Sequence, residues 1–259
     1  MIFTDGVFFV FFACVFLAYW LVRVRRVQNL ILLVGSYVFY GWIHPWFCIL
    51  IAVSTVVDFT VGLAIHRKRE HGRAFLLVSL VTNLGMLGFF KYFNFFAENV
   101  YRLGTGLGLN LDPVTLQIFL PVGISFYTFQ TLSYTIDIYR GRMEPRTSFL
   151  DFALFVSFFP QLVAGPIERA KRFLPQIETP RRWRMELLYS AWPLIVTGYL
   201  KKIVVADNVA VFVNKVYMLE QPSLLLLTAG TLAFTVQIFA DFSAYTDLAR
   251  GFARLLGFD

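Results

Sequence analysis

The sequence predicts an all-α, polytopic integral membrane protein. Hydrophobic residues make up 58% of the 259 residues and charged residues only 15%, whereas soluble domains carry about 25% charged residues. The mean hydropathy is +0.66. The apolar residues form stretches close to the roughly 20 residues that a helix needs to cross a bilayer. Because backbone amides find no water there, the spanning segments are expected to be helical.

Eight apolar segments follow one another along the chain. They cover residues 6–22, 27–43, 45–65, 74–97, 114–139, 149–167, 187–213 and 224–240. The first four are each expected to cross once, and the fifth is broken early by Pro121 and Gly123. No soluble domain or linker separates them, so 1–259 is expected to form a single membrane domain.

Charge bias sets the expected orientation, because short loops rich in Lys and Arg stay on the cytoplasmic side. Such loops follow the first, third and fifth segments, at 23–26, 67–73 and 140–146. The connections between them carry one basic residue, Arg102. The first segment lacks a basic leader and a cleavage site, so it is expected to remain as a span with the amino terminus outside.

The alternation of basic cytoplasmic loops with less basic outer loops fails at the next loop. Residues 169–184 are also strongly basic, although one more crossing would place them outside. The simplest path is a re-entrant segment at 149–167, which enters and leaves on one side and is broken by Pro160, Gly165 and Pro166. Two short spans, or an exception to the charge rule, are the alternatives.

Five polar residues are candidates for lining a substrate pocket. Gln237, Asp241 and Tyr245 follow i, i+4 spacing and share one helix face. Ionisable residues at membrane depth are rare and point to function. Gln161 and Glu168 flank the breaks of the re-entrant segment, where they could meet a thioester. The alternatives are a buried hydrogen-bond partner for Asp241 and a tight turn around Gln161 and Glu168.

The remaining polar residues have simpler explanations. A second stripe on the last helix is interpreted as a helix end emerging into solvent, and a run after 200 as part of a surface helix. The stripe comprises Ser243, Asp247, Arg250 and Arg254, and the run comprises Lys201, Lys202, Asp207 and Asn208. Asp58 and Asn83 are expected to bridge helices, and Asp137 to form a local ion pair.

Neither a metal site, a bound cofactor nor a nucleic-acid partner is predicted. Cys14 and Cys48 lie inside apolar segments without a CxxC spacing. The histidines, His44, His66 and His71, fall in turns and basic loops without a partner carboxylate, so no catalytic residue is assigned within the chain. The net charge of +7 comes from short loop runs rather than one polar face.

Four stretches in fixed order resemble the membrane-bound O-acyltransferase family, and its alginate O-acetylation branch in particular. They are Pro121–Gln130, Asp137–Gly141, Phe158–Ile167 and Asp241–Asp247. Phe90–Phe96 and Lys201–Asp207 are similar to that branch as well. The resemblance covers most of the chain, with N-terminal spans in 1–113 and the first part of the family's core in 114–259.

The resemblance implies a helical bundle around a tunnel in a bacterial inner membrane. A thioester donor, acetyl-CoA or an acyl carrier, would supply an acyl group for a polysaccharide hydroxyl outside the membrane, where partner proteins finish the transfer. The family's catalytic histidine lies downstream of the Asp-Phe-Ser motif and is therefore expected beyond Asp259. The chain accordingly resembles the N-terminal part of such an enzyme.

Two other functions fit some of these features. A transporter or flippase also contains broken helices and buried polar residues. Transporters commonly show two similar halves, and the sequence contains no such repeat. A non-catalytic, truncated membrane protein is the third hypothesis.

Overall fold

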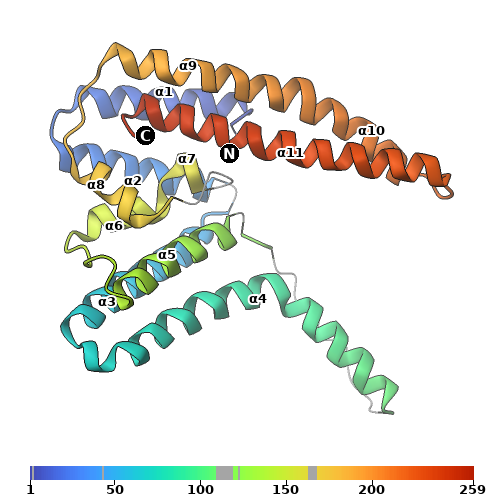
Figure 1. The fold of residues 1–259 in the computed structure, drawn as a ribbon, viewed down its shortest axis with the longest axis horizontal. Coiled ribbons are helices and arrows are strands. Elements are labelled where there is room, and N and C mark those ends of the chain that lie inside the picture. The colour runs from blue at the N-terminus through green and yellow to red at the C-terminus, as the bar shows by residue number, and fades with distance from the viewer. Residues whose placement is uncertain (2, 43, 109–118, 122, 163–167) are drawn as a thin grey trace. The chain divides into compact units, whose positions relative to one another are not determined.

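The computed structural model describes residues 1, 3–42, 44–108, 119–121, 123–162 and 168–259. These residues form helices and irregular connections and no strand, as an all-α protein requires (Figure 1). The helices are α1 (Gly6–Leu21), α2 (Arg25–Gly41), α3 (Phe47–Arg67), α4 (Gly72–Gly106), α5 (Ile124–Tyr139), α6 (Phe149–Ser157), α7 (Phe159–Leu162), α8 (Ala170–Glu178), α9 (Met185–Tyr199), α10 (Asp207–Tyr217) and α11 (Leu224–Leu255). A short 3₁₀ turn, η1 (Arg69–His71), precedes α4, and a π-helix, η2 (Leu200–Ala206), joins α9 to α10.

Three helical segments are long and apolar enough to cross a membrane. They are α3, the η1–α4 segment and α11, and α1 is a shorter apolar helix of 16 residues. This result agrees with a membrane protein. Each of the eight apolar segments contains helix, although the number of crossings stays a prediction.

The described residues divide into two compact units. Unit 1 contains 1–35, 158–162 and 178–259, and unit 2 contains 36–157 and 168–177, apart from the positions outside the described residues. The organisation of 1–259 as one membrane domain stays a prediction.

In unit 2, α3, α4 and α5 pack against one another around a polar cluster. Asp58 of α3 is fully buried and accepts hydrogen bonds from Ser79 Oγ, from Asn83 Nδ2 at 2.8 Å and from Thr135 Oγ1 at 3.0 Å. Ser54 Oγ donates to Asn83 Oδ1 at 2.6 Å. Asp58 and Asn83 therefore bridge helices, as predicted.

In unit 1, the continuous run of α9, η2 and α10 lies alongside α11 (Figure 1). Two glycines permit the close approach. A Cβ atom on Gly198 would lie 2.7 Å from Leu248 Cγ, and one on Gly251 would lie 2.6 Å from Ile195 Cγ1. Small residues commonly let membrane helices pack this closely.

One helix end differs from its predicted position. α4 continues to Gly106, through much of the stretch expected to be a loop after residue 97. α11 continues to Leu255 and carries both polar stripes, as expected, and its last turns bury Leu248, Phe252 and Leu255 in unit 1. Arg250 of the second stripe is exposed, and the emergence of this helix end into solvent stays a prediction.

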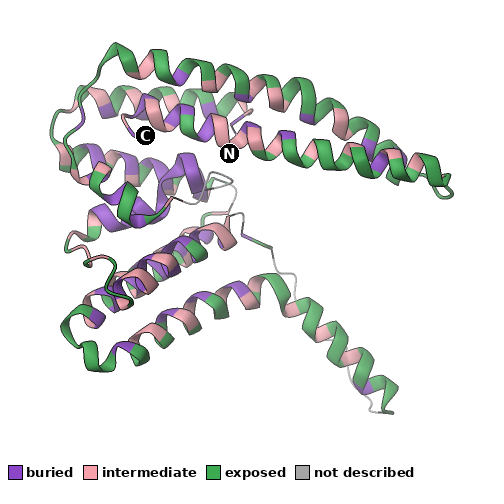
Figure 2. Ribbon diagram, viewed as in Figure 1, coloured by how far each residue is buried: buried purple, intermediate pink, exposed green. Residues whose placement is uncertain are grey.

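The segment 149–167 contains a broken helix. α6 has nine residues and would extend only about 14 Å, less than half of a 30 Å hydrocarbon core. Its residues 151–157 are buried, as Figure 2 shows, and the helix is interrupted at Phe158 before α7. Gly165 and Pro166 lie outside the described residues, and the re-entrant path stays a prediction.

Candidate functional site

The predicted polar face of the last helix is present in α11. Gln237, Asp241 and Tyr245 lie one turn apart in an unbroken helix, and all three are half-buried. The Oε1 atom of Gln237 is buried and has no hydrogen-bond partner among the described residues. We call these three residues the α11 face.

Lys202 of the π-helix pairs with this face. Its Nζ atom lies 2.8 Å from Asp241 Oδ1 and 2.9 Å from Asp207 Oδ1. The Lys202 side chain is 17% exposed, whereas those of Asp241 and Asp207 are 42% and 51% exposed. The cation is thus covered by protein, and the carboxylates remain accessible from one side.

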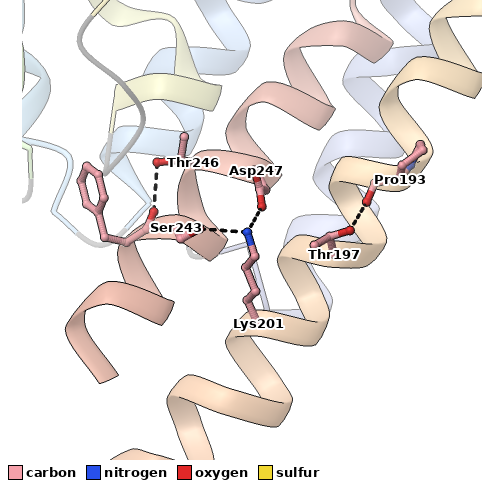
Figure 3. Close-up of polar contacts among 7 residues, drawn as sticks. Pro193, Thr197, Lys201, Ser243, Thr246 and Asp247 are labelled. Carbon is pink, nitrogen blue, oxygen red and sulfur yellow. Dashed lines mark hydrogen bonds and ion pairs between the residues drawn. The ribbon is translucent and has the colours of Figure 1, made fainter. Parts of the chain in front are cut away.

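Lys201 pairs with the neighbouring side of α11. Its Nζ atom lies 2.6 Å from Asp247 Oδ2 and donates to Ser243 Oγ at 2.9 Å (Figure 3). Asp247 is only 15% exposed, so this carboxylate depends on the lysine for its stabilisation. Ser243 and Asp247 therefore belong to an interhelical contact.

The π-helix brings both lysines to α11. Consecutive residues in an α-helix point about 100° apart, and a π-turn widens the helix locally, a feature frequent at functional sites. The carbonyls of Ile203 and Val204 accept hydrogen bonds from Asn208 Nδ2 at 3.0 and 2.9 Å. Asn208 thereby satisfies backbone groups at the junction of η2 and α10.

Sequence reasoning missed the two lysines, because the run containing them was interpreted as part of a surface helix. The structure adds ion pairs of Lys201 and Lys202 with α11, which that interpretation did not include, and the surface position of the segment stays a prediction. The signal was present in the sequence: two adjacent lysines inside a long apolar segment require acidic partners nearby. Asp241 and Asp247, six positions apart on another apolar helix, are such partners.

Tyr245 lies beside the start of the chain. Its ring centroid is 5.5 Å from that of Phe3, and Tyr199 Oη donates to the Phe3 carbonyl at 2.7 Å. Phe3 is 2% exposed and also packs on Phe252. Phe3 therefore covers one side of Tyr245 and is itself held to α9 by Tyr199.

The other two predicted pocket residues lie in different units. Gln161 belongs to α7, is 7% exposed, and sits on a helix that packs against α11 in unit 1. Glu168 belongs to unit 2, where it lies half-buried ahead of α8. The pocket role of all five residues stays a prediction.

The three histidines belong to unit 2, whereas these ion pairs belong to unit 1. His66 and His71 are exposed, and the His44 ring contacts Phe47 with a centroid distance of 5.1 Å. Cys14 and Cys48 are free thiols. Within the described ranges, no group of three or more His, Cys, Asp or Glu residues is placed to hold a metal ion. The expected ion pair of Asp137 is present, with Oδ1 3.8 Å from Arg142 Nη1.

Comparison with known proteins gives similarity to O-acetylases and O-acetyltransferases over nearly all of this chain. The chain is 37% identical over 261 residues to a probable alginate O-acetylase from Pseudomonas aeruginosa, covering 100% of this chain and 50% of that protein. It is 32% identical over 286 residues to a peptidoglycan O-acetyltransferase from Helicobacter pylori, covering 97% of this chain and 53% of that protein.

A more distant similarity covers half of the chain. It is 26% identical over 148 residues to a teichoic acid D-alanyltransferase from Bacillus subtilis, covering 52% of this chain and 35% of that protein. No protein-family model matches the chain. The chain spans about half the length of the alginate O-acetylases it matches. Over its whole length, the chain is similar to the first part of the family that its motifs indicated, the alginate O-acetylases among them.

Proposed function

We propose that this chain forms part of a membrane O-acyltransferase. The complete protein would move an acetyl or similar acyl group from a thioester, acetyl-CoA or an acyl carrier, toward a hydroxyl group of an extracytoplasmic polysaccharide. The names of the relatives support acyl transfer to cell-surface polymers and do not favour the transporter alternative. The observation that carries the proposal for this chain is the pairing of Lys201 and Lys202 with acids of α11.

These pairs lie far from the end of α11. At 1.5 Å per residue, Asp247 and Asp241 are about 12 and 21 Å from Leu255 along the helix axis. A hydrocarbon core is about 30 Å thick. If Leu255 lies near a membrane surface, both carboxylates are at membrane depth, where ionisable residues occur mainly at functional sites.

The chemistry needs a hydroxyl oxygen to attack a thioester carbonyl. The new carbon–oxygen bond replaces the carbon–sulfur bond, a base takes the hydroxyl proton, and the departing thiolate takes up a proton. In this proposal the base is the histidine that the family resemblance places beyond Asp259. The α11 face supplies hydrogen-bonding groups along the path, and Lys201 with Asp247 holds η2 against α11.

The proposed setting is a bacterial inner membrane with the amino terminus outside. The basic loops at 23–26, 67–73, 140–146 and 169–184 would then face the cytoplasm, where the donor is made. Partner proteins outside the membrane would complete transfer to the polysaccharide.

A chimaeric protein tests the proposal. In P. aeruginosa cells that lack their own probable alginate O-acetylase, the aligned part of that protein would be replaced by this chain, and the acetyl content of secreted alginate would be measured. Restored acetylation supports the proposal. A chimaera that is inserted at normal levels yet yields unacetylated alginate would refute it. The unmodified relative serves as the positive control.

A further inference from the structure

Unit 1 contains a cationic cavity separate from the α11 face. Its volume is about 550 Å³, and it lies between the α1–α2 connection and the segment before α9. Arg23, Arg181 and Arg182 contribute three guanidinium groups to its lining. Among the described residues, none of those lining it is acidic. Both segments belong to loops that the charge bias places on the cytoplasmic side.

Arg181 is built into the wall of this cavity. It is 8% exposed, donates from Nη2 to Asn29 Oδ1, and lies 4.6 Å from the ring centroid of Phe258. The ring of Tyr19 is 5.7 Å away on another side. Stacking on aromatic rings fixes a guanidinium in one orientation. The cavity therefore presents a fixed positive charge as well as two exposed ones.

Gln28, one of the residues that line the cavity, carries a buried acceptor. It is 1% exposed, and its Nε2 atom donates to the Val22 carbonyl at 2.9 Å. The Oε1 atom is buried with no hydrogen-bond partner among the described residues. A buried acceptor normally has a partner, and a hydroxyl or ammonium group on a ligand would supply the missing donor.

Two tryptophans lie at the same place. Trp20 and Trp183 both line the cavity, with ring centroids 5.4 Å apart, and Trp20 Nε1 donates to the Leu255 carbonyl at 3.1 Å. Tryptophan is enriched at the level of lipid headgroups, where one side of the ring is apolar and the other is wet. The cavity is thus expected at the membrane–water interface.

We propose that this cavity binds a phosphate ester that also carries a hydroxyl or ammonium donor. Arginine binds phosphate through two parallel hydrogen bonds, and Gln28 would accept from the second group. An anionic phospholipid headgroup and a soluble phosphate compound share this chemistry. Basic pockets between membrane helices commonly bind phospholipid headgroups. The proposal does not rest on acyl transfer.

Quenching of tryptophan by brominated lipids tests it. The whole chain is placed in phosphatidylcholine nanodiscs that contain a small fraction of either dibrominated phosphatidylglycerol or dibrominated phosphatidylcholine. The amount by which dibrominated phosphatidylglycerol quenches more than dibrominated phosphatidylcholine measures the preferential binding of phosphatidylglycerol. Arg23→Gln with Arg182→Gln removes the two exposed charges of the cavity. Arg26→Gln with Arg184→Gln is the matched control, because it removes two exposed charges close in sequence to Arg23 and Arg182 but outside the cavity lining.

For a lipid headgroup, the cavity variant lowers the apparent affinity for phosphatidylglycerol about tenfold, and the control variant keeps it. If the cavity binds a soluble phosphate compound instead, dibrominated phosphatidylglycerol gives no excess quenching. Pyrophosphate added to phosphatidylcholine nanodiscs then changes the tryptophan fluorescence of the original chain and of the control variant, but not that of the cavity variant. Equal losses in both variants indicate general surface attraction and overturn the proposal. Absence of both responses overturns it as well.

Discussion

Lys201 Nζ lies 2.6 Å from Asp247 Oδ2, an ion pair between the π-helix η2 and the long helix α11. Lys201 stands in the apolar segment 187–213, and Asp247 stands in α11, a helix long and apolar enough to cross a membrane, so each charge would be costly at membrane depth without the other. Gly198, one turn before Lys201, lets the two helices approach closely enough for the pair to form. Helix packing and charge pairing therefore depend on each other here.

Loss of the Lys201 charge should destabilise unit 1. Lys201→Met leaves the 15% exposed Asp247 carboxylate without its lysine, and we expect a loss of about 1–2 kcal/mol of unfolding free energy, less than for a fully buried pair. Combining Lys201→Met with Asp247→Leu should cost less than the sum of the single changes. Additive costs, measured by reversible unfolding in detergent micelles, would show that the pair contributes nothing.

Gly198→Ala should weaken the contact between α9 and α11. The new Cβ would lie 2.7 Å from Leu248 Cγ and 3.1 Å from the Ala244 carbonyl oxygen, which is backbone and cannot rotate away. We expect a loss of about 1–3 kcal/mol. Gly88→Ala in α4 is the control, since no atom lies within 4 Å of its Cβ position. That change should be neutral or stabilise by up to about 1 kcal/mol. Equal thermal stabilities of the two variants would contradict the packing.

Asp58→Ala should destabilise unit 2. Ser79, Asn83 and Thr135 would each lose the acceptor that Asp58 provides, in a fully buried setting. We expect a cost of about 2–3 kcal/mol, because buried donors without partners are expensive. Thr60→Val on the same helix is the control, since Thr60 is exposed and bonds only to carbonyls of its own helix. A similar small effect of both changes on unfolding would argue against the cluster.

Residues 23 and 182 should be accessible from the same side of the membrane, because Arg23 and Arg182 line one cavity. In a background carrying Cys14→Ser and Cys48→Ser, Arg23→Cys and Arg182→Cys should both react with an impermeant maleimide in inside-out vesicles only. Arg102→Cys, near the end of α4 that is expected outside, should react in right-side-out vesicles. Labelling of residues 23 and 182 from opposite sides would overturn the placement of these loops.

The sequence predicted the fold well where apolar length decided the structure. The helices around Asp58 and Asn83 form as expected, because a carboxylate and an amide in apolar segments must find partners there. Helix ends were harder to predict. The stretch from Glu98 on was expected to be a connection, yet α4 continues to Gly106.

The candidate site was predicted only in part. The spacing of Gln237, Asp241 and Tyr245 specifies a shared face in any α-helix, and that face is present. The pairing of Lys202 with Asp241 joins residues 39 positions apart through a π-turn. No local pattern of charges predicts a widened turn, so the lysines appeared to belong to a surface.

The most direct measurement is alginate acetylation by the chimaera carrying Asp241→Asn, compared with Asp207→Asn. Both carboxylates lie within 2.9 Å of Lys202 Nζ, but only Asp241 belongs to the α11 face. We predict at least about a tenfold loss of acetyl content for Asp241→Asn, equivalent to about 1.4 kcal/mol, and less than about a twofold loss for Asp207→Asn. Full acetylation with Asp241→Asn, or equal losses in the two variants at equal membrane levels, would contradict the account.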